Sequence, residues 1–320
     1  MREIGGYFEK EQLICNRGEY YNSLISLNSA RNSLVYIVKA KHITKIYLPY
    51  YLCDSVSGVC ERENIAYEYY HIDSNFRPIF EKSLEINEYI YIVNFFGQLS
   101  IEDILKLKKE YDRIIIDNVQ AFYEKPIDGI DTIYSCRKFF GVPDGAYLST
   151  DINSIFDLPM DNSDERTDHI FGRTRDGALA HYEEFKKNDE LFKQLPVAKM
   201  SELTHNMLSK IDYDKIRKIR EENFSYLHER LCKCNKLDIE LPTGPYMYPF
   251  YNNDCEIIRK NLINKKIYVP VLWPNVLELG ESLEKDYAKN ILPLPCDQRY
   301  STEEMKIIFE EVINCINLEK

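Results

Sequence analysis

The stretch that decides the fold is "IYSCRKFFGVPDGAYLS", residues 133–149. Its two ends are short apolar runs that predict strands. Between them lie a basic pair, two phenylalanines and a Gly-Val-Pro-Asp-Gly turn. The second basic residue, Lys138, follows almost directly after the first strand. A lysine at that place is either a solvated charge that closes a loop or a nucleophile held at a strand end. The rest of the chain has to distinguish the two.

Strands and helices alternate through the first half of the chain. Apolar runs predict strands, and segments with apolar residues on one face predict helices. The first long helix can be capped by Asn28 or Ser29, and the second by Asp54. The predicted strands are residues 45–49, 66–72, 89–93, 113–117, 132–135 and 146–149, and the predicted helices are 29–40, 54–63 and 101–111. This order predicts an α/β fold with a mainly parallel central sheet and helices on both sides.

After about residue 150 the pattern changes. Residues 161–178 are polar and charged, which indicates a loop or an excursion, and a long helical region follows at 201–235. A last helix begins with a capping box formed by Ser301 and Glu304. Between these helices, the segments "LDIEL", "YMYPF" and "KIYVPVLW" are interpreted as strands around a helix at 255–264.

These patterns divide the chain near residue 200. We predict a large domain, residues 1–200, which includes an N-terminal arm and the polar excursion near 153–200. The remaining residues, 201–320, are predicted to form a smaller C-terminal α+β domain that begins with a long helix.

The composition narrows the class of protein. With 320 residues, 44% of them hydrophobic, the chain can build a large core, and its formal net charge of −11 disfavours nucleic-acid binding. Nine cysteines without a CxxC motif favour reduced thiols in a cytoplasm over disulfides or a metal site. We find no signal peptide and no stretch of the roughly 20 apolar residues that a membrane helix needs, so we expect no membrane partner.

Polar side chains follow two of the predicted strands at the edge where a parallel sheet binds ligands. Asp117 ends "RIIID" and Gln120 lies three residues further on, while Ser135 ends "TIYS" and Lys138 lies three residues further on. The first long helix starts at Ala30, where free N–H groups favour a phosphate.

These groups are the ones that pyridoxal phosphate (PLP) needs. A lysine forms a Schiff base with an aldehyde, a carboxylate holds a protonated pyridine nitrogen, and a serine and a helix N-terminus hold a phosphate ester. Each residue also has an ordinary alternative. Asp117 can cap a helix, Ser135 can close a turn, and Lys138 can be a solvated surface charge.

At these motifs the chain resembles the DegT/StrS group of sugar aminotransferases, which are PLP-dependent enzymes of fold type I. The resemblance covers nearly the whole chain. In many members a glycine stands where this chain has Pro143, which weakens any transfer of substrate specificity. The motifs that carry it are "EIGGYFE", "LNSARNSL", "LPYYLCDSV", "NFFGQ", "IIIDNVQAF", "SCRKFFGVPDGAYL", "VLWP" and "NILPLPCDQRYSTEEM".

The resemblance implies catalytic and cofactor-binding roles. Asp117 matches the aspartate that pairs with the pyridine nitrogen, and Gln120 matches the residue that contacts the phenolic oxygen of the ring. Lys138 matches the lysine that forms the Schiff base and moves the proton in transamination.

It also implies contacts around the rest of the cofactor. Ser135 and the backbone N–H groups of Ala30 and Arg31 match the groups that bind the phosphate. Either Tyr51 or Cys53 is placed to cover the ring. The family further implies a homodimer with shared active sites, for which Arg173 is the candidate phosphate ligand from the partner subunit.

The activity that the resemblance implies is amino-group transfer from an amino acid to a keto-sugar nucleotide, in surface polysaccharide or related amino-sugar biosynthesis. Two alternatives remain open: dehydration of a sugar nucleotide, and PLP binding without catalysis. Dehydrating members usually have histidine in place of the lysine, so Lys138 disfavours the first. A Rossmann-type NAD enzyme is disfavoured because no GxGxxG motif follows the first strand.

Overall fold

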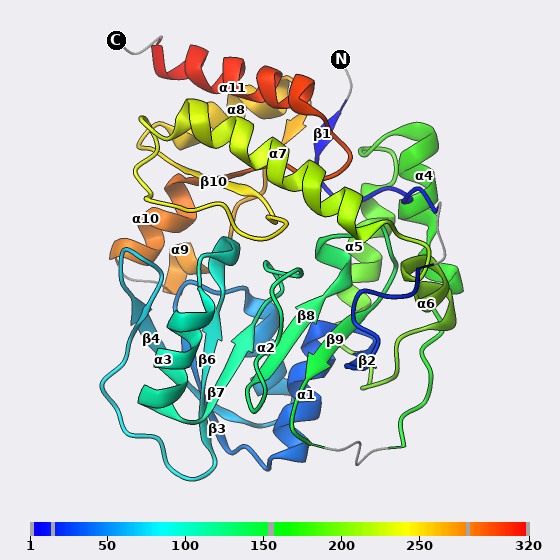
Figure 1. Cartoon of the computed structure of the whole chain (residues 1–320), viewed down its shortest axis with the longest axis vertical. Coiled ribbons are helices and arrows are strands. Elements are labelled where there is room, and N and C mark those ends of the chain that lie inside the picture. The colour runs from blue at the N-terminus through cyan, green and yellow to red at the C-terminus, as the bar shows by residue number, and fades with distance from the viewer. Residues whose placement is uncertain (1–2, 14–16, 153–156, 280–281, 318–320) are drawn as a thin grey trace.

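An eight-stranded sheet lies between helices in the lower half of the molecule as drawn in Figure 1. The computed structural model describes residues 3–13, 17–152, 157–279 and 282–317. In spatial order the strands of the sheet are β2 (Ile25–Leu27), β9 (Ala146–Ser149), β8 (Asp131–Ser135), β7 (Ile114–Asp117), β6 (Glu88–Val93), β3 (Lys45–Pro49), β4 (Ala66–Ile72) and β5 (Pro78–Ile79).

The middle of this sheet is parallel and its two ends are antiparallel. Strands β8, β7, β6, β3 and β4 all run in the same direction, whereas β9 and β2 at one end and β5 at the other run against their neighbours. Asp117 pairs with Val93 on one side and with Ile133 on the other. The carboxyl ends of β6, β7 and β8 therefore meet at one edge. The prediction of a mainly parallel sheet is confirmed.

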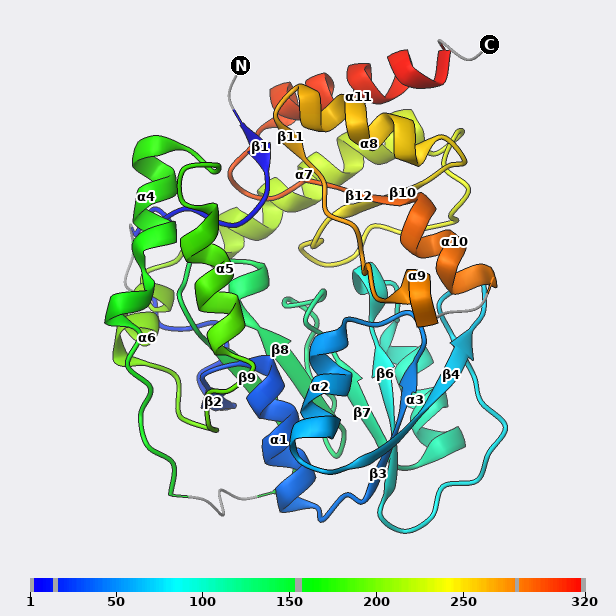
Figure 2. The same ribbon diagram turned by 180° about the vertical axis from the view of Figure 1, so that it is seen from behind.

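Helices cover both faces of the sheet. Helices α1 (Ala30–Ala40) and α2 (Asp54–Arg62) lie on one face and α3 (Ile101–Tyr111) on the other (Figures 1 and 2). The Ser29 side chain caps α1 by accepting from the N–H of Asn32. The expected cap of α2 is wrong: Asp54 is its first helical residue, and Cys53 takes the cap position without a side-chain hydrogen bond.

The polar segment after residue 156 is helical, which corrects the prediction of a loop at 161–178. It contains the short 3₁₀ turn η3 (Asp164–Arg166), α4 (Asp168–Asp176) and α5 (Tyr182–Leu191). Both helices lie at the edge of the molecule (Figure 2), and their charged residues other than Arg173 are exposed or partly exposed.

Arg173 of α4 is buried, so it is not a solvated arginine of a loop. Its side chain is 4% exposed and donates to the backbone carbonyls of Gly5 and Tyr7 and to the carboxylate of Glu9. These contacts hold the N-terminal arm against α4. The structure therefore disfavours Arg173 as a phosphate ligand in a partner subunit, because its guanidinium is engaged within its own chain.

From α7 onward, the C-terminal part of the chain lies beyond the carboxyl edge of the sheet, whereas α6 lies at its side near β9 (Figure 1). Strand β10 pairs with β12, and β11 pairs with the N-terminal strand β1 (Ile4–Gly5). The N-terminal arm thus packs with the elements from α7 to α11, which together form the C-terminal layer. The elements of this part are α6 (Glu202–Leu208), α7 (Tyr213–Leu231), β10 (Tyr248–Tyr251), α8 (Cys255–Asn264), β11 (Ile267–Tyr268), α9 (Val276–Leu279), α10 (Ser282–Asn290), β12 (Ile291–Leu294) and α11 (Thr302–Asn317).

Several C-terminal predictions are confirmed and others are wrong. The helix at 255–264 is present, and Glu304 accepts from the N–H and hydroxyl of Ser301 at the start of α11, which is one half of the predicted capping box. The region 201–235 forms two helices, and "LDIEL" forms no strand.

Two negative observations concern the described residues alone. None of their helices combines the length and apolar composition that a membrane crossing requires. No disulfide joins any of their cysteines, and Cys15 lies outside the described residues.

Candidate active site

A pocket lies at the carboxyl ends of β6, β7 and β8, between the first turns of α1 and α2 and the C-terminal layer. The structure brings together most of the site residues predicted from the sequence. The predicted residues that line the pocket are Ala30, Arg31, Cys53, Asp117, Gln120, Ser135 and Lys138. Tyr51 and Arg173 do not line it.

Asp117 is a buried carboxylate at the end of β7. Its Oδ1 accepts from the N–H of Val119 at 2.8 Å, and its Oδ2 accepts from the Tyr91 hydroxyl at 2.8 Å. Burial raises the pKa of Asp117 to about 6, although both hydrogen bonds and the charge of Lys138 act to lower it. A buried carboxylate this poorly solvated favours a cationic or strongly donating ligand beside it.

Lys138 ends the 3₁₀ turn η2 (Cys136–Lys138) that follows β8, and its side chain is exposed to the pocket. Acidic groups around it raise the pKa of Lys138, with Tyr246 contributing most and Cys53 and Asp189 less, while burial opposes them. The amine is therefore a cation at neutral pH in the free protein.

The turn after Lys138 is anchored on both sides. Cys136, Phe139 and Phe140 are buried in an aromatic cluster. The carboxylate of Asp144, fully buried, accepts from the backbone and side chain of Ser201 at the start of α6. These contacts fix the backbone of η2, so that Lys138 is presented to the pocket by a rigid support.

The other end of the pocket favours an anion. The N-terminus of α1 reaches it at Ser29 and Ala30, and Ser135 lines the same wall. The Nε atom of Arg31 is buried and has no hydrogen-bond partner among the described residues. A helix N-terminus, a hydroxyl and an unsatisfied guanidinium donor form a donor set suited to phosphate.

Gln120 is held by its oxygen. Its Oε1 accepts from the N–H of Phe96 at 2.8 Å, and the side chain is buried. The amide NH₂ is therefore the group that Gln120 can offer to a ligand in the pocket.

Among comparisons with known proteins, only the comparison with solved structures finds matches to this chain. No protein-family model matches the chain, and neither does any curated protein. Solved structures match over nearly its whole length. A DegT DnrJ EryC1 StrS aminotransferase from Brucella abortus superposes with a TM-score of 0.64 at 12% identity, covering 91% of this chain and 85% of that one. The chain has the DegT/StrS aminotransferase fold.

Two further structures support the same assignment of the fold. Spr1654 of Streptococcus pneumoniae, assigned as a sugar aminotransferase and solved in its PLP form, matches with a TM-score of 0.62 at 13% identity, covering 97% of this chain and 93% of that one. DesI, solved in the presence of its TDP-sugar product, matches with a TM-score of 0.65 at 13% identity, covering 91% of this chain and 80% of that one.

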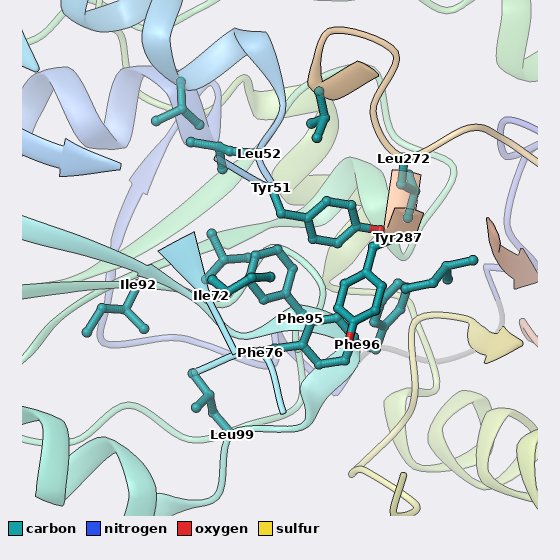
Figure 3. Close-up of a cluster of buried hydrophobic side chains, with 14 of the residues drawn as sticks. Tyr51, Leu52, Ile72, Phe76, Ile92, Phe95, Phe96, Leu99, Leu272 and Tyr287 are labelled. Atoms are coloured by element: carbon teal, nitrogen blue, oxygen red, sulfur yellow. The ribbon is translucent and has the colours of Figure 1, made fainter. Parts of the chain in front are cut away.

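Within this DegT/StrS fold, Tyr51 does not belong to the pocket. Its ring is fully buried among Phe76, Phe95, Tyr287 and Trp273, with ring centroids 5.0–6.4 Å away (Figure 3). The expectation that Tyr51 covers a bound ring is thus wrong, because aromatic packing draws it into the core. Cys53, two residues later, does line the pocket.

Two aromatic residues in the pocket wall were not predicted from the sequence. Tyr246 and Trp273 both come from the C-terminal layer and face the strand ends. Asn275 fixes the Trp273 segment by donating to the carbonyl of Leu52 at 2.9 Å. Sequence reasoning missed both aromatics because they lie more than 100 residues from Lys138 and outside any regular element.

A charge cluster was also missed. The carboxylate of Asp189 on α5 lies between Arg31 and Arg137, at 3.3 and 3.2 Å. Although burial raises it, Arg137 and Arg31 lower the pKa of Asp189 to about 2. The charged lining residues are thus three cations, including Lys138, and two carboxylates, including Asp117, which leaves a net charge of +1.

Proposed function

We propose that this protein is a PLP-dependent aminotransferase that moves an amino group from an amino acid to a keto-sugar nucleotide. The observation that carries the proposal is the meeting of Asp117, Lys138, Ser135 and the α1 N-terminus in one pocket. The donor set fits the cofactor at both ends, because a buried carboxylate lies at one end and unsatisfied phosphate donors lie at the other.

When bound, PLP supplies an aldehyde that condenses with amines and a pyridine ring that accepts electrons from a breaking carbon–hydrogen bond. Asp117 holds a proton at the ring nitrogen by a charge-assisted hydrogen bond. The amide nitrogen of Gln120 donates toward the oxygen substituent of the ring. Ser135 and the N–H groups of Ala30 and Arg31 bind the phosphate.

Lys138 acts at its Nζ atom. It is cationic in the free protein, so it has to lose a proton before it can bond to a carbonyl carbon. As a free amine, the neutral Nζ would be the group in the pocket able to move a proton between neighbouring carbon atoms of a bound substrate. Trp273 and Tyr246 form the wall of the pocket on the side of the C-terminal layer.

The acceptor is proposed to be a nucleotide sugar. The support for this acceptor is DesI, which shares the fold and was solved in the presence of its TDP-sugar product. In this proposal the product enters surface polysaccharide or another amino-sugar pathway in the cytoplasm.

The test is amine transfer against a panel of keto-sugar nucleotides, with glutamate, glutamine and alanine as donors. We expect transfer to at least one keto-sugar nucleotide and none to the free keto-sugar. Transfer only to small keto acids would contradict the proposed acceptor class while leaving the PLP chemistry intact.

The single tryptophan of the chain provides a direct reading of cofactor binding. Because Trp273 lines the pocket, bound PLP lies close enough to accept its excitation energy. We expect PLP to quench most of the tryptophan fluorescence in a saturable titration, and pyridoxine, which lacks the phosphate, to quench little. Full fluorescence in protein shown by mass spectrometry to hold PLP would mean that the cofactor binds elsewhere.

We also propose a homodimer and a division into a large domain, residues 1–200, and a small one, residues 201–320. The support for the dimer is a set of large apolar side chains that stay exposed on α4, α5 and their connection, next to the pocket residue Asp189: Phe171, Leu179, Tyr182 and Leu191. Sedimentation velocity should give twice the 37.9 kDa chain mass. A fully active monomer would contradict the dimer.

A further inference from the structure

A hydroxyl group that the proposed mechanism does not use contacts its buried carboxylate. Tyr91 lies on β6, next to β7 in the sheet, and is buried. Its phenol donates to Oδ2 of Asp117 at 2.8 Å, and the N–H of Val119 donates to Oδ1 at the same distance. Both oxygens of the carboxylate are thus held from inside the protein.

This arrangement fixes the orientation of the Asp117 carboxylate without occupying all of its acceptor positions. An ionised carboxylate offers about four acceptor positions, and the two donors take one on each oxygen. The plane of the carboxylate cannot rotate without breaking one of these bonds. Acceptor positions remain for a donor in the pocket, which meets a carboxylate that is already oriented.

The phenol also sets which protonation state of Asp117 is favoured. Burial raises the pKa of Tyr91 well above its ordinary value, and the nearby Asp117 raises it further, so the phenol keeps its proton. It can therefore donate to the charged carboxylate but cannot take its proton. A hydrogen bond to a charged acceptor stabilises the ionised form.

We propose that Tyr91 is a positioning residue that keeps Asp117 oriented and ionised, so that a proton shared with a ring nitrogen in the pocket stays on the nitrogen. The identity of that ring as PLP rests on the proposed function. Without the phenol, the buried carboxylate would hold the proton more strongly, and the ring would lose the charge that makes it an electron acceptor.

The groups facing this pair do not offer a competing explanation. Lys138 faces Asp117 from η2 and favours its ionised form. Cys53 and Cys60 face Tyr91 from α2 and the segment before it, and burial raises the pKa of Cys60 to about 12, so its thiol is neutral. Tyr91 is the side-chain hydroxyl that donates to Asp117 among the described residues.

The test uses Tyr91→Phe, with Tyr70→Phe as the matched control. Tyr70 is also a buried tyrosine of the sheet, and its hydroxyl donates to the backbone carbonyl of Tyr91 at 2.7 Å, without touching Asp117. The first measurement follows the titration of Asp117 by carboxyl ¹³C NMR of cofactor-free protein. We expect Asp117 to titrate at higher pH in Tyr91→Phe than in the parent, and at the parental pH in Tyr70→Phe.

The second reading uses PLP labelled with ¹⁵N in the ring. We expect the nitrogen of the Tyr91→Phe complex to shift toward its unprotonated resonance, with turnover reduced about tenfold or more. A fluorinated tyrosine at position 91, a stronger donor, should move both readings the opposite way and is informative even if the phenylalanine variant folds poorly.

An unchanged Asp117 titration in Tyr91→Phe, or an equal shift in Tyr70→Phe, would overturn the inference. The titration of the free protein needs no cofactor. If PLP does not bind at all, the proposed function fails, and the titration still decides whether Tyr91 controls Asp117.

Discussion

Replacement of Lys138 by alanine is expected to lower amine transfer by at least about 10⁴-fold, because the residue serves as both nucleophile and proton carrier. Lys138 carries the only amino group among the described residues that line the pocket. The guanidinium groups of Arg31 and Arg137 remain protonated and cannot replace it. The measurement is single-turnover transfer from the amino donor to PLP-loaded protein.

Two controls separate chemistry from folding. Lys138→Arg keeps the charge beside Asp117 but should be as inactive as the alanine variant, because a guanidinium does not release its proton. A small primary amine such as methylamine should restore part of the activity of Lys138→Ala by entering the space left by the side chain. Activity of Lys138→Ala within tenfold of the parent would mean that the lysine is a solvated charge.

Replacement of Asp117 by asparagine is expected to reduce turnover about 10- to 150-fold, as loss of a charge-assisted hydrogen bond worth about 1.5–3 kcal/mol implies. The asparagine keeps the shape: its oxygen can still accept from the N–H of Val119, while its NH₂ takes the place of Oδ2 and can donate to the Tyr91 hydroxyl, which then acts as an acceptor. The variant should therefore bind PLP and fold. Near-parental turnover would mean that Asp117 only stabilises the segment after β7.

The same substitution should stabilise the cofactor-free protein. The pKa of Asp117 is raised above its unfolded value, so the carboxyl group favours folding only while it is protonated. That contribution is lost as the pH rises from 3.8 through about 6. The difference between these values corresponds to a cost on the order of 3 kcal/mol at pH 8.

Urea unfolding of cofactor-free protein measures this effect. Asp117→Asn should be more stable than the parent at pH 8 and should lose that advantage at pH 4. An equal difference at both pH values would show that packing, and not ionisation, is responsible.

The core of the site could be predicted because alternating strands and helices imply its geometry. Once 113–117 and 132–135 are parallel strands, their last residues must meet at one edge, and the structure places Asp117, Ser135 and Lys138 there. The residues that hold this group could not be predicted in the same way. Asp189 lies within a run of surface charges, and only the packing of α5 brings it between Arg31 and Arg137.

The strand prediction for "LDIEL" shows that a pattern can predict correctly which side chains are buried and still predict the wrong secondary structure. Leu237 and Ile239 are buried, as their alternation indicates. The segment pairs with no strand, and at Glu240 the side chain of Gln98 bonds to both the N–H and the carbonyl of its backbone. Alternation reports which side chains are buried and does not identify the partner of the backbone.

The most direct test of the central claim is to locate the cofactor. Purified protein is loaded with PLP, treated with borohydride, which reduces a Schiff base to a stable bond, and digested for peptide mass spectrometry. The proposed function predicts one labelled residue, Lys138. A label on Lys193, which lines the adjoining cavity, or no label on protein that retains PLP, would contradict it.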